Sequence, residues 1–267
     1  MQPILQRIRD TGLSGIPSFD GKRQTEAEIF NNLQGKLEGY DCPKCKNKGI
    51  IYAMQGEELI SHECECMKTR RSIDRFKRSG LETAIKSKTL LNFTHSEDFQ
   101  NAMLNKAVNF VKSGGRCFFI GGQIGCGKTH ICTGIAGALL KRGKAVRYIQ
   151  WRDDIPKLKA AVTTQDYAAE LEKIKKVDVL YIDDLFKTKD EATPTAADIN
   201  IAFEVINYRY NNPELITIIS CQQMFAELLT VDEATASRIA EMCGEYSLSI
   251  ARDIKRNYRL KGMIDAI

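Results

Sequence analysis

A glycine-rich run, Gly122-Gln-Ile-Gly-Cys-Gly-Lys-Thr129, constrains this chain more than any other feature. The apolar segment before it, residues 116–122, predicts a buried strand, and residues 128–141 after it predict a helix. The run fits the pattern G-x-x-x-x-G-K-[ST], and a strand before it with a helix after it is the context of a P-loop. Its glycines let backbone N–H groups face phosphates, and the helix N-terminus behind them favours an anion. The sequence therefore predicts a nucleotide-binding loop rather than an ordinary glycine-rich turn.

The residues of this loop have separate expected roles. Lys128 is expected to reach the β- and γ-phosphates of ATP, and Thr129 is expected to hold Mg²⁺. His130 follows the loop, and nothing in the sequence pairs it with a nucleophile. The residues expected to contact the nucleotide are Gly122, Gln123, Ile124, Gly125, Cys126, Gly127, Lys128, Thr129 and His130.

The rest of the second part of the chain alternates apolar runs with helical periodicity. Further strands are expected at 144–150, 177–184, 215–221 and 247–250. Helices are expected at 154–174 and 195–211, followed by two short helices after the fourth strand. Unbroken apolar strands separated by helices predict a parallel sheet with helices on both faces. The fold class is therefore α/β, with a doubly wound P-loop domain.

Two carboxylates end the strand expected at 177–184. Asp183 and Asp184 follow four hydrophobic residues, which places them at the carboxyl edge of the sheet beside the P-loop. Asp183 is expected to bind Mg²⁺, and Asp184 is expected to orient the water that attacks ATP. The alternative is a solvated turn. Ser220 and Gln222 end the next strand, where either side chain is a candidate γ-phosphate sensor or only part of a strand-to-loop transition.

Four of the nine cysteines, Cys42, Cys45, Cys64 and Cys66, lie within 25 residues of one another. Close cysteine pairs of this kind predict a structural Zn²⁺ site. The Cys-x-Cys spacing of the second pair is less usual, so His62 is an alternative ligand, and a redox pair is the rival interpretation. An odd cysteine count and an N-terminus without an apolar stretch favour a reducing, cytoplasmic location.

Positive charge is concentrated in two segments of a chain whose net charge is +5. Residues 66–90 contain eight basic and two acidic residues, and residues 252–261 contain five basic residues and one acidic residue. Such clustering is typical of proteins that bind polyanions, although two solvated helix faces would look the same. No apolar run reaches the ~20 residues that a membrane-spanning helix needs, so no membrane partner is expected.

Taken together, the runs IGGQIGCGKTH, VDVLYIDDLFK, LITIISCQQMFAELLTVDEATASRI and RDIKRNYRLK resemble replicative helicase loaders of the DnaC/DnaI family, most closely phage and prophage forms. The segments CPKCKNKG and CECMKTRRS are similar to the N-terminal cysteine cluster of those proteins. The resemblance covers roughly residues 40–267. It implies an AAA+ ATPase, related to IstB-type transposition helpers, that uses ATP and Mg²⁺, forms ATP-dependent oligomers, and binds a replicative helicase and single-stranded DNA.

The resemblance also assigns roles to arginines. Arg238 is similar to an arginine finger that reaches the ATP of a neighbouring subunit. Arg259 is similar to the second sensor arginine, with Arg256 as the alternative. Two features depart from the usual AAA+ pattern: Gln222 stands near the position of the first-sensor asparagine, and no separate helical lid is expected after residue 250.

The expected organisation is an N-terminal arm (1–40) that is a candidate partner-binding helix, a zinc module (41–67), a basic linker (68–90) and the ATPase domain (91–267). The expected function is loading of a ring helicase onto single-stranded DNA. Two alternatives remain: a transposition helper that binds duplex DNA, and a DNA-binding adaptor in which the P-loop locks a conformation without hydrolysis.

Overall fold

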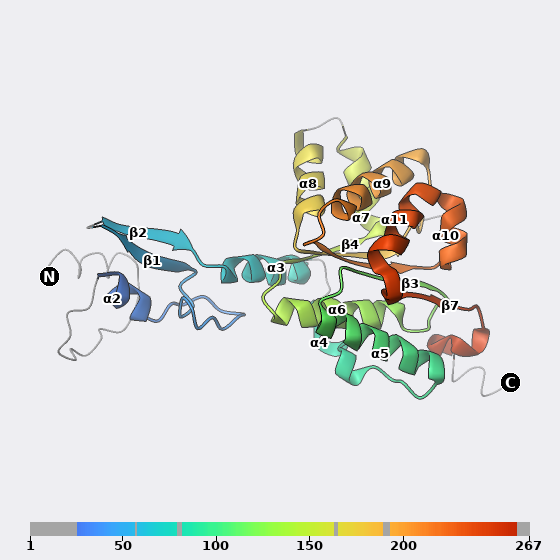
Figure 1. Cartoon of the computed structure of the whole chain (residues 1–267), viewed down its shortest axis with the longest axis horizontal. Coiled ribbons are helices and arrows are strands. Elements are labelled where there is room, and N and C mark those ends of the chain that lie inside the picture. The colour runs from blue at the N-terminus through green and yellow to red at the C-terminus, as the bar shows by residue number, and fades with distance from the viewer. Residues whose placement is uncertain (1–25, 57, 79–81, 163–164, 189–192, 261–267) are drawn as a thin grey trace. The chain divides into compact units, whose positions relative to one another are not determined.

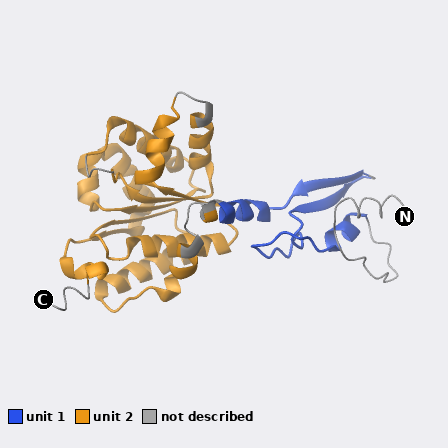
Figure 2. Ribbon diagram, turned by 180° about the vertical axis from the view of Figure 1, so that it is seen from behind, with its two compact units in different colours: residues 1–74 blue, residues 75–267 orange. Residues whose placement is uncertain are grey.

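The computed structural model describes residues 26–56, 58–78, 82–162, 165–188 and 193–260. The chain divides into two compact units, residues 1–74 and 75–267 (Figure 2). Most of the expected N-terminal arm and the end of the basic tail lie outside the described residues. None of the described helices is both long and apolar enough to cross a membrane.

The first unit is built around a cysteine cluster and a hairpin. Helix α2 (Glu26–Asn32) lies within the expected N-terminal arm, and its Phe30 stacks on Tyr52 with ring centroids 4.9 Å apart. Strands β1 (Ile50–Gln55) and β2 (Glu58–Glu63) pair antiparallel. Helix α3 (Cys66–Arg78) begins at the last cysteine of the cluster, so part of the expected linker is helical.

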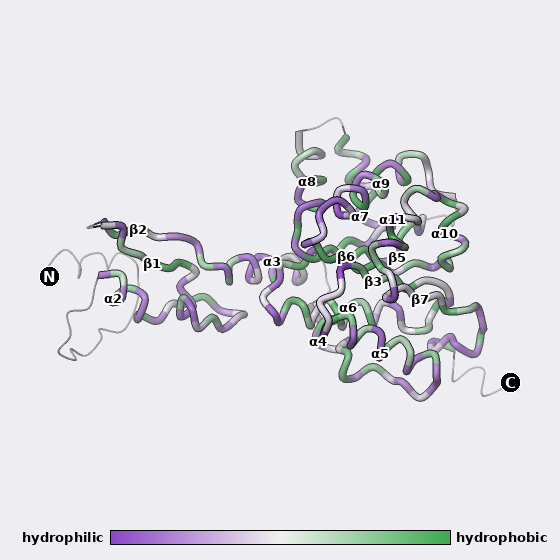
Figure 3. The backbone as a smooth tube through the Cα atoms, in the orientation of Figure 1, coloured by the Kyte–Doolittle hydropathy of each residue, from purple (hydrophilic) through white to green (hydrophobic). Residues whose placement is uncertain are grey.

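The second unit contains the predicted parallel sheet, with strand order β4-β5-β6-β3-β7 (Figure 1). The central strands are mainly apolar, as their colour in Figure 3 shows, because both faces of the sheet are covered. All neighbouring strands of this sheet pair in parallel, with Phe119 opposite Ile219 and Ile182 opposite Ile219. The strands are β3 (Cys117–Gly122), β4 (Val146–Gln150), β5 (Val179–Leu185), β6 (Ile216–Cys221) and β7 (Ser247–Ile250).

Helices cover both faces of this sheet (Figure 1). Helices α5 (Asp98–Ser113) and α6 (Lys128–Lys141) lie on one face, with the short α4 (Glu82–Ser87) against α6. The other face carries α7 (Trp151–Ala160), α8 (Gln165–Lys176), α9 (Ala196–Tyr210), α10 (Phe225–Val231) and α11 (Glu233–Cys243). Short 3₁₀ turns at Leu90–Asn92, Gly244–Tyr246, Ile254–Arg256 and Tyr258–Leu260 complete the unit.

Most expected elements are present, with shifted ends. The helical stretch expected at 154–174 is two helices, α7 and α8. Thr195 caps α9 by accepting the backbone N–H of Asp198, in agreement with the expected helix start. Trp151 begins α7 and packs against Phe186, with ring centroids 5.4 Å apart, and both side chains are buried.

A buried arginine, Arg209 near the end of α9, ties three elements together. Its guanidinium donates to Thr217 Oγ1 and to the carbonyl oxygens of Lys175, Val177 and Ile216. Lys175 is in the last turn of α8, Val177 follows that helix, and Ile216 begins β6. Burial lowers the pKa of Arg209 to about 10, so it remains charged at neutral pH. These contacts hold together the amino-terminal ends of β5 and β6, at the end of the sheet away from the P-loop. No sequence pattern indicated them.

Candidate active site and metal centre

The P-loop joins β3 to α6 in a conformation that only glycine adopts easily. Gly122 and Gly125 have φ angles of +100° and +77°. A Cβ on Gly122 would lie 2.0 Å from the Ile250 carbonyl oxygen, and one on Gly125 would lie 1.9 Å from Asn257 Oδ1. Both glycines are therefore required by close packing of β7 and the following tail against the loop.

Lys128 begins α6 and is turned back onto the loop. Its Nζ donates to the carbonyl oxygens of Gly122 and Gln123 at 2.8 Å and 2.6 Å. The side chain is buried, and burial lowers its pKa. The ammonium is thus held at the centre of the loop, where an incoming phosphate would compete with these two carbonyl groups.

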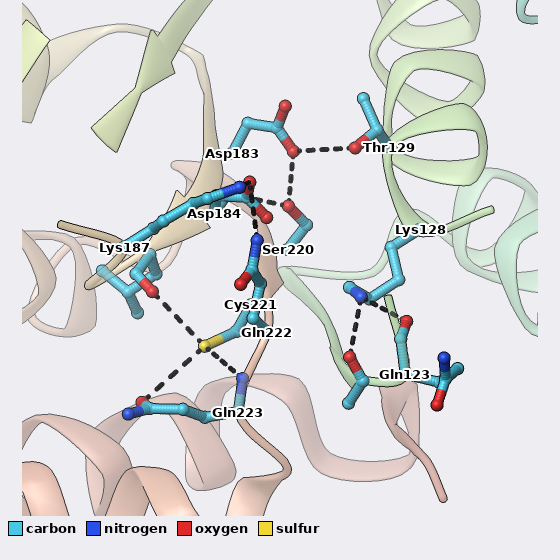
Figure 4. Close-up of polar contacts among 12 residues, drawn as sticks. Gln123, Lys128, Thr129, Asp183, Asp184, Lys187, Ser220, Cys221, Gln222 and Gln223 are labelled. Atoms are coloured by element: carbon cyan, nitrogen blue, oxygen red, sulfur yellow. Dashed lines mark hydrogen bonds and ion pairs between the residues drawn. The ribbon is translucent and has the colours of Figure 1, made fainter. Parts of the chain in front are cut away.

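The two expected magnesium ligands lie together although 54 residues separate them. Thr129 Oγ1 lies 3.3 Å from Asp183 Oδ1 (Figure 4). Asp183 is buried at the end of β5 and also accepts hydrogen bonds from Tyr181 Oη at 2.9 Å, Tyr148 Oη at 3.1 Å and Ser220 Oγ. Burial raises the pKa of both tyrosines, which keeps them protonated as donors. A hydroxyl and a carboxylate are oxygen ligands of the kind that Mg²⁺ prefers, so these two residues fit that ion.

Asp184 is held by contacts from two other segments. Its backbone N–H donates to Ser220 Oγ at 2.9 Å, and its Oδ2 lies 3.3 Å from Gln222 Nε2 and 2.9 Å from Lys187 Nζ. Its φ of 54° lies in the left-handed region. Ser220 therefore contacts the acid pair itself, while Gln222 reaches both Asp184 and the cavity described next.

A cavity of about 380 Å³ lies over the P-loop. It brings together most residues for which we expected a role in nucleotide binding, and Arg259 rather than Arg256 reaches it. The Arg256 guanidinium lies over the Phe99 ring instead, 5.4 Å from its centroid. The cavity is lined by Lys88, Ile124, Gly125, Gly127, Lys128, Thr129, His130, Arg152, Asp184, Lys187, Gln222 and Arg259.

Some residues that line this cavity were not identified from the sequence. Arg152 is the second residue of α7 and lies two residues after the end of β4, and its position after a strand of the sheet was a usable signal. Lys88 belongs to the basic segment. His130, by contrast, was among the expected contacts: it lines the cavity, lies 2.9 Å from the Thr89 carbonyl oxygen and packs edge-on against Phe93. Burial lowers the pKa of His130, which favours a neutral ring.

Arg238 lies away from this cavity, on α11. Its Nε donates to Asn207 Oδ1 at 3.0 Å, and its guanidinium lies over the Phe203 ring, 4.8 Å from the centroid. It is not among the residues that line the cavity of its own chain. Its expected role toward a neighbouring subunit therefore stays a prediction.

The four clustered cysteines form a compact and buried set. Their Sγ atoms lie within 4.8 Å of one another, with Cys42 to Cys64 at 3.8 Å and Cys45 to Cys66 at 3.5 Å. A tetrahedral zinc with bonds of about 2.3 Å places sulfurs about 3.8 Å apart, so the donor set fits Zn²⁺. Burial acts to raise the pKa of Cys45, but hydrogen bonds from the Gly49 N–H and the other thiols bring it to about 7.

The expected alternative ligand, His62, lies apart from the cysteine cluster. It is exposed on β2, so the arrangement favours the four cysteines as the expected ligands. Two arginines of the basic segment serve the module itself. Arg70 donates to the Glu38 and Tyr40 carbonyl oxygens, and Arg71 pairs with Glu63, so their charges are partly engaged within the first unit.

Residues 42–240 match a protein family described as IstB-like ATP binding protein. The chain belongs to this family. The match spans both the cysteine cluster and the P-loop, and it ends before Arg259.

Relatives of similar length are known in Bacillus subtilis. The chain is 28% identical to the uncharacterized protein YqaM over 97% of this chain and 95% of that protein. It is 29% identical to XkdC, a protein of the phage-like element PBSX, over 84% of this chain and 88% of that protein.

Among solved structures, the DnaC helicase loader has a similar fold. The TM-score is 0.55 at 22% identity, and the match covers 64% of this chain and 99% of that chain. The second unit therefore has the AAA+ fold, and the chain is an ATP-binding protein of that class.

Proposed function

We propose that this chain is an ATPase whose second unit binds and hydrolyses ATP in the cavity over the P-loop. The observation that carries this is the meeting of Thr129, Asp183 and Asp184 beside the Lys128 ammonium. Backbone N–H groups of the loop and Lys128 would bind the phosphates, and Arg259 would add a second positive charge. Thr129 and Asp183 would hold Mg²⁺, which offsets phosphate charge when bound.

Within this site, Asp184 would accept a hydrogen bond from the attacking water and orient it toward the γ-phosphate. Phosphoryl transfer depends mainly on such positioning and on charge stabilisation. Gln222 lines the cavity beside Asp184 and would contact the same phosphate. Arg238 of one subunit would supply a further positive charge to the ATP of the next, which makes hydrolysis depend on oligomer formation.

Substitutions test the enzymatic part directly. Lys128→Ala should abolish or severely weaken ATP binding, because the ammonium at the centre of the loop is lost. Asp184→Asn should retain ATP binding and lose turnover. The two variants are compared by calorimetric titration with ATP and by phosphate release. Normal hydrolysis by Asp184→Asn would refute the role given to Asp184, and absence of turnover in the parent protein would favour the non-hydrolysing adaptor.

The biological role we propose is that of a helicase loader. The protein would use ATP to close an oligomer, hold single-stranded DNA through basic residues and place a replicative ring helicase on it. Support comes from the AAA+ fold shared with the DnaC loader, the phage-element relative and the cysteine module. A cytoplasmic location is proposed with this role.

The family description favours one alternative, a transposition helper that binds duplex DNA and a transposase. A pull-down from host extract separates the two, with the intact chain as bait and ATP present. Recovery of a replicative helicase supports the loader, and recovery of a transposase instead refutes it. Lys128→Ala as bait is the control, because an ATP-dependent partner should be lost with it.

A further inference from the structure

Lys187 makes a contact to the site that neither the motifs nor the family assign. It lies three residues after Asp184, and its Nζ is 2.9 Å from Asp184 Oδ2. Gln222 Nε2 reaches the same oxygen at 3.3 Å. One oxygen of the Asp184 carboxylate thus accepts from two donors in the nucleotide-free chain, so it is not free to accept from a water molecule.

The Lys187 ammonium is also placed where a phosphate would arrive. Lys187 and Asp184 both line the cavity that contains Lys128 and Thr129. Their side chains are 28% and 22% exposed, so the ion pair is partly shielded from solvent and still open to the cavity. Lys187 and Gln222 also line an adjoining cavity of about 490 Å³, so they form part of the wall between the two spaces.

The backbone around this pair is fixed, which leaves the lysine side chain as the part that moves. Asp184 and Phe186 have φ angles of 54° and 62°, in the left-handed region that is strained for a residue other than glycine. Ser220 anchors the Asp184 N–H, and buried Phe186 packs against Trp151. The flexible stem of Lys187 can reach another anion in the cavity without a change in this strained turn.

We propose that Lys187 is a γ-phosphate-binding residue and that ATP draws its ammonium away from Asp184. This inference rests on the proposed ATPase function. The γ-phosphate carries more negative charge than one carboxylate and offers several acceptor oxygens, so it is the stronger partner for an ammonium. The released Asp184 oxygen then accepts from the attacking water. ADP has no γ-phosphate, so Lys187 returns to Asp184 after hydrolysis and phosphate release.

If Lys187 binds the γ-phosphate, it should strengthen binding of ATP and not of ADP. Binding of ADP and of a non-hydrolysable ATP analogue to the full chain is measured by calorimetry with Mg²⁺. All variants in this comparison keep Asp184. Lys187→Met should weaken binding of the analogue by about tenfold, the size of one charge-assisted hydrogen bond, and leave ADP binding unchanged. Lys187→Arg should retain most of the discrimination.

A matched control lies in α7, where Lys157 pairs with Asp154 at the same spacing, 3.1 Å apart and outside the cavity. Lys157→Met should change neither affinity. Equal weakening of both nucleotides by Lys187→Met, or weakening of neither, would overturn the proposal.

A double-mutant cycle tests the release of Asp184. Asp184→Asn removes the partner that competes for Lys187, so it should tighten binding of the ATP analogue more when Lys187 is present than in Lys187→Met. Equal effects of Asp184→Asn in the two backgrounds would contradict a shared ammonium. If the parent chain binds no ATP at all, the proposed function fails and this inference fails with it. If the parent binds ATP and the discrimination is unchanged in Lys187→Met, only this inference fails.

Discussion

The Ser220 hydroxyl donates to the Asp183 carboxylate and accepts the backbone N–H of Asp184. One side chain at the end of β6 therefore orients both acids at the end of β5. Ser220 is fully buried, and both of its hydrogen-bonding partners belong to the acid pair. Its position supports a positioning role better than direct contact with a γ-phosphate.

Ser220→Ala is expected to lower turnover by about tenfold, since it removes a donor from Asp183 and leaves a buried N–H without its acceptor. The Mg²⁺ concentration that gives half-maximal activity should rise, while ATP binding without Mg²⁺ should be unchanged. Mg²⁺ titrations of phosphate release measure both effects. Ser113→Ala, at the end of α5, is the control. A Mg²⁺ dependence equal to that of the parent would refute the positioning role.

The zinc assignment predicts one Zn²⁺ per chain. A Cys42→Ser, Cys45→Ser double variant should lose the metal and the fold of the first unit, because the described part of that unit is stabilised by the cluster and a small core. The second unit has its own core and should keep its thermal transition. Elemental analysis and calorimetry measure these outcomes. His62→Ala should retain the metal, and its loss in that variant would contradict the ligand set.

How far the sequence predicts this molecule differs between its parts. The P-loop, the acid pair and the cysteine cluster were predictable because each function requires fixed residue types at short spacing or at a strand end. Lys187 and Tyr148 were not, because a lysine in a loop and a tyrosine in a strand are ordinary there. Tyr148 matters because the pairing of β4 with β5 brings its hydroxyl to Asp183. Lys187 matters because the turn after β5 brings its ammonium back to Asp184, and a sequence does not show that turn.

Arg209 illustrates the same limit for stability. A single arginine near the end of an apolar helix predicts a surface residue, yet its guanidinium donates to four oxygens inside the fold. Arg209→Met should lower the free energy of unfolding by roughly 3 kcal/mol or more, because buried acceptors lose their donor. Urea denaturation measures this. Exposed Lys141→Met is the control, and a similarly small effect of both substitutions would show that Arg209 is dispensable.

DNA binding, if it follows from the basic segments, should be dominated by phosphate contacts. Affinity should fall steeply with salt, show little sequence preference and be stronger for single strands than for duplex. Exposed Lys77 and Lys255 are suitable probes, and each change to glutamine should reduce the salt slope by about one. Arg71→Gln is the comparison, since Arg71 pairs with Glu63. A strong preference for duplex would favour the transposition helper.

The role proposed for Arg238 predicts that each hydrolysis site is formed by two neighbouring subunits. It lies on α11 outside the cavity of its own chain. If it acts on a neighbour's ATP, as proposed, turnover per chain should rise with protein concentration. Arg238→Ala should bind ATP about as well as the parent and hydrolyse it slowly.

Mixing variants separates this role from a structural one. Arg238→Ala mixed with Lys128→Ala should recover part of the activity, because some interfaces combine an intact P-loop with an intact arginine. Lys128→Ala mixed with Asp184→Asn should recover none, because both changes damage the same side of the interface and no intact site forms. Turnover per chain that is independent of dilution, or equal activity in the two mixtures, would exclude Arg238 as a residue acting on the neighbouring site.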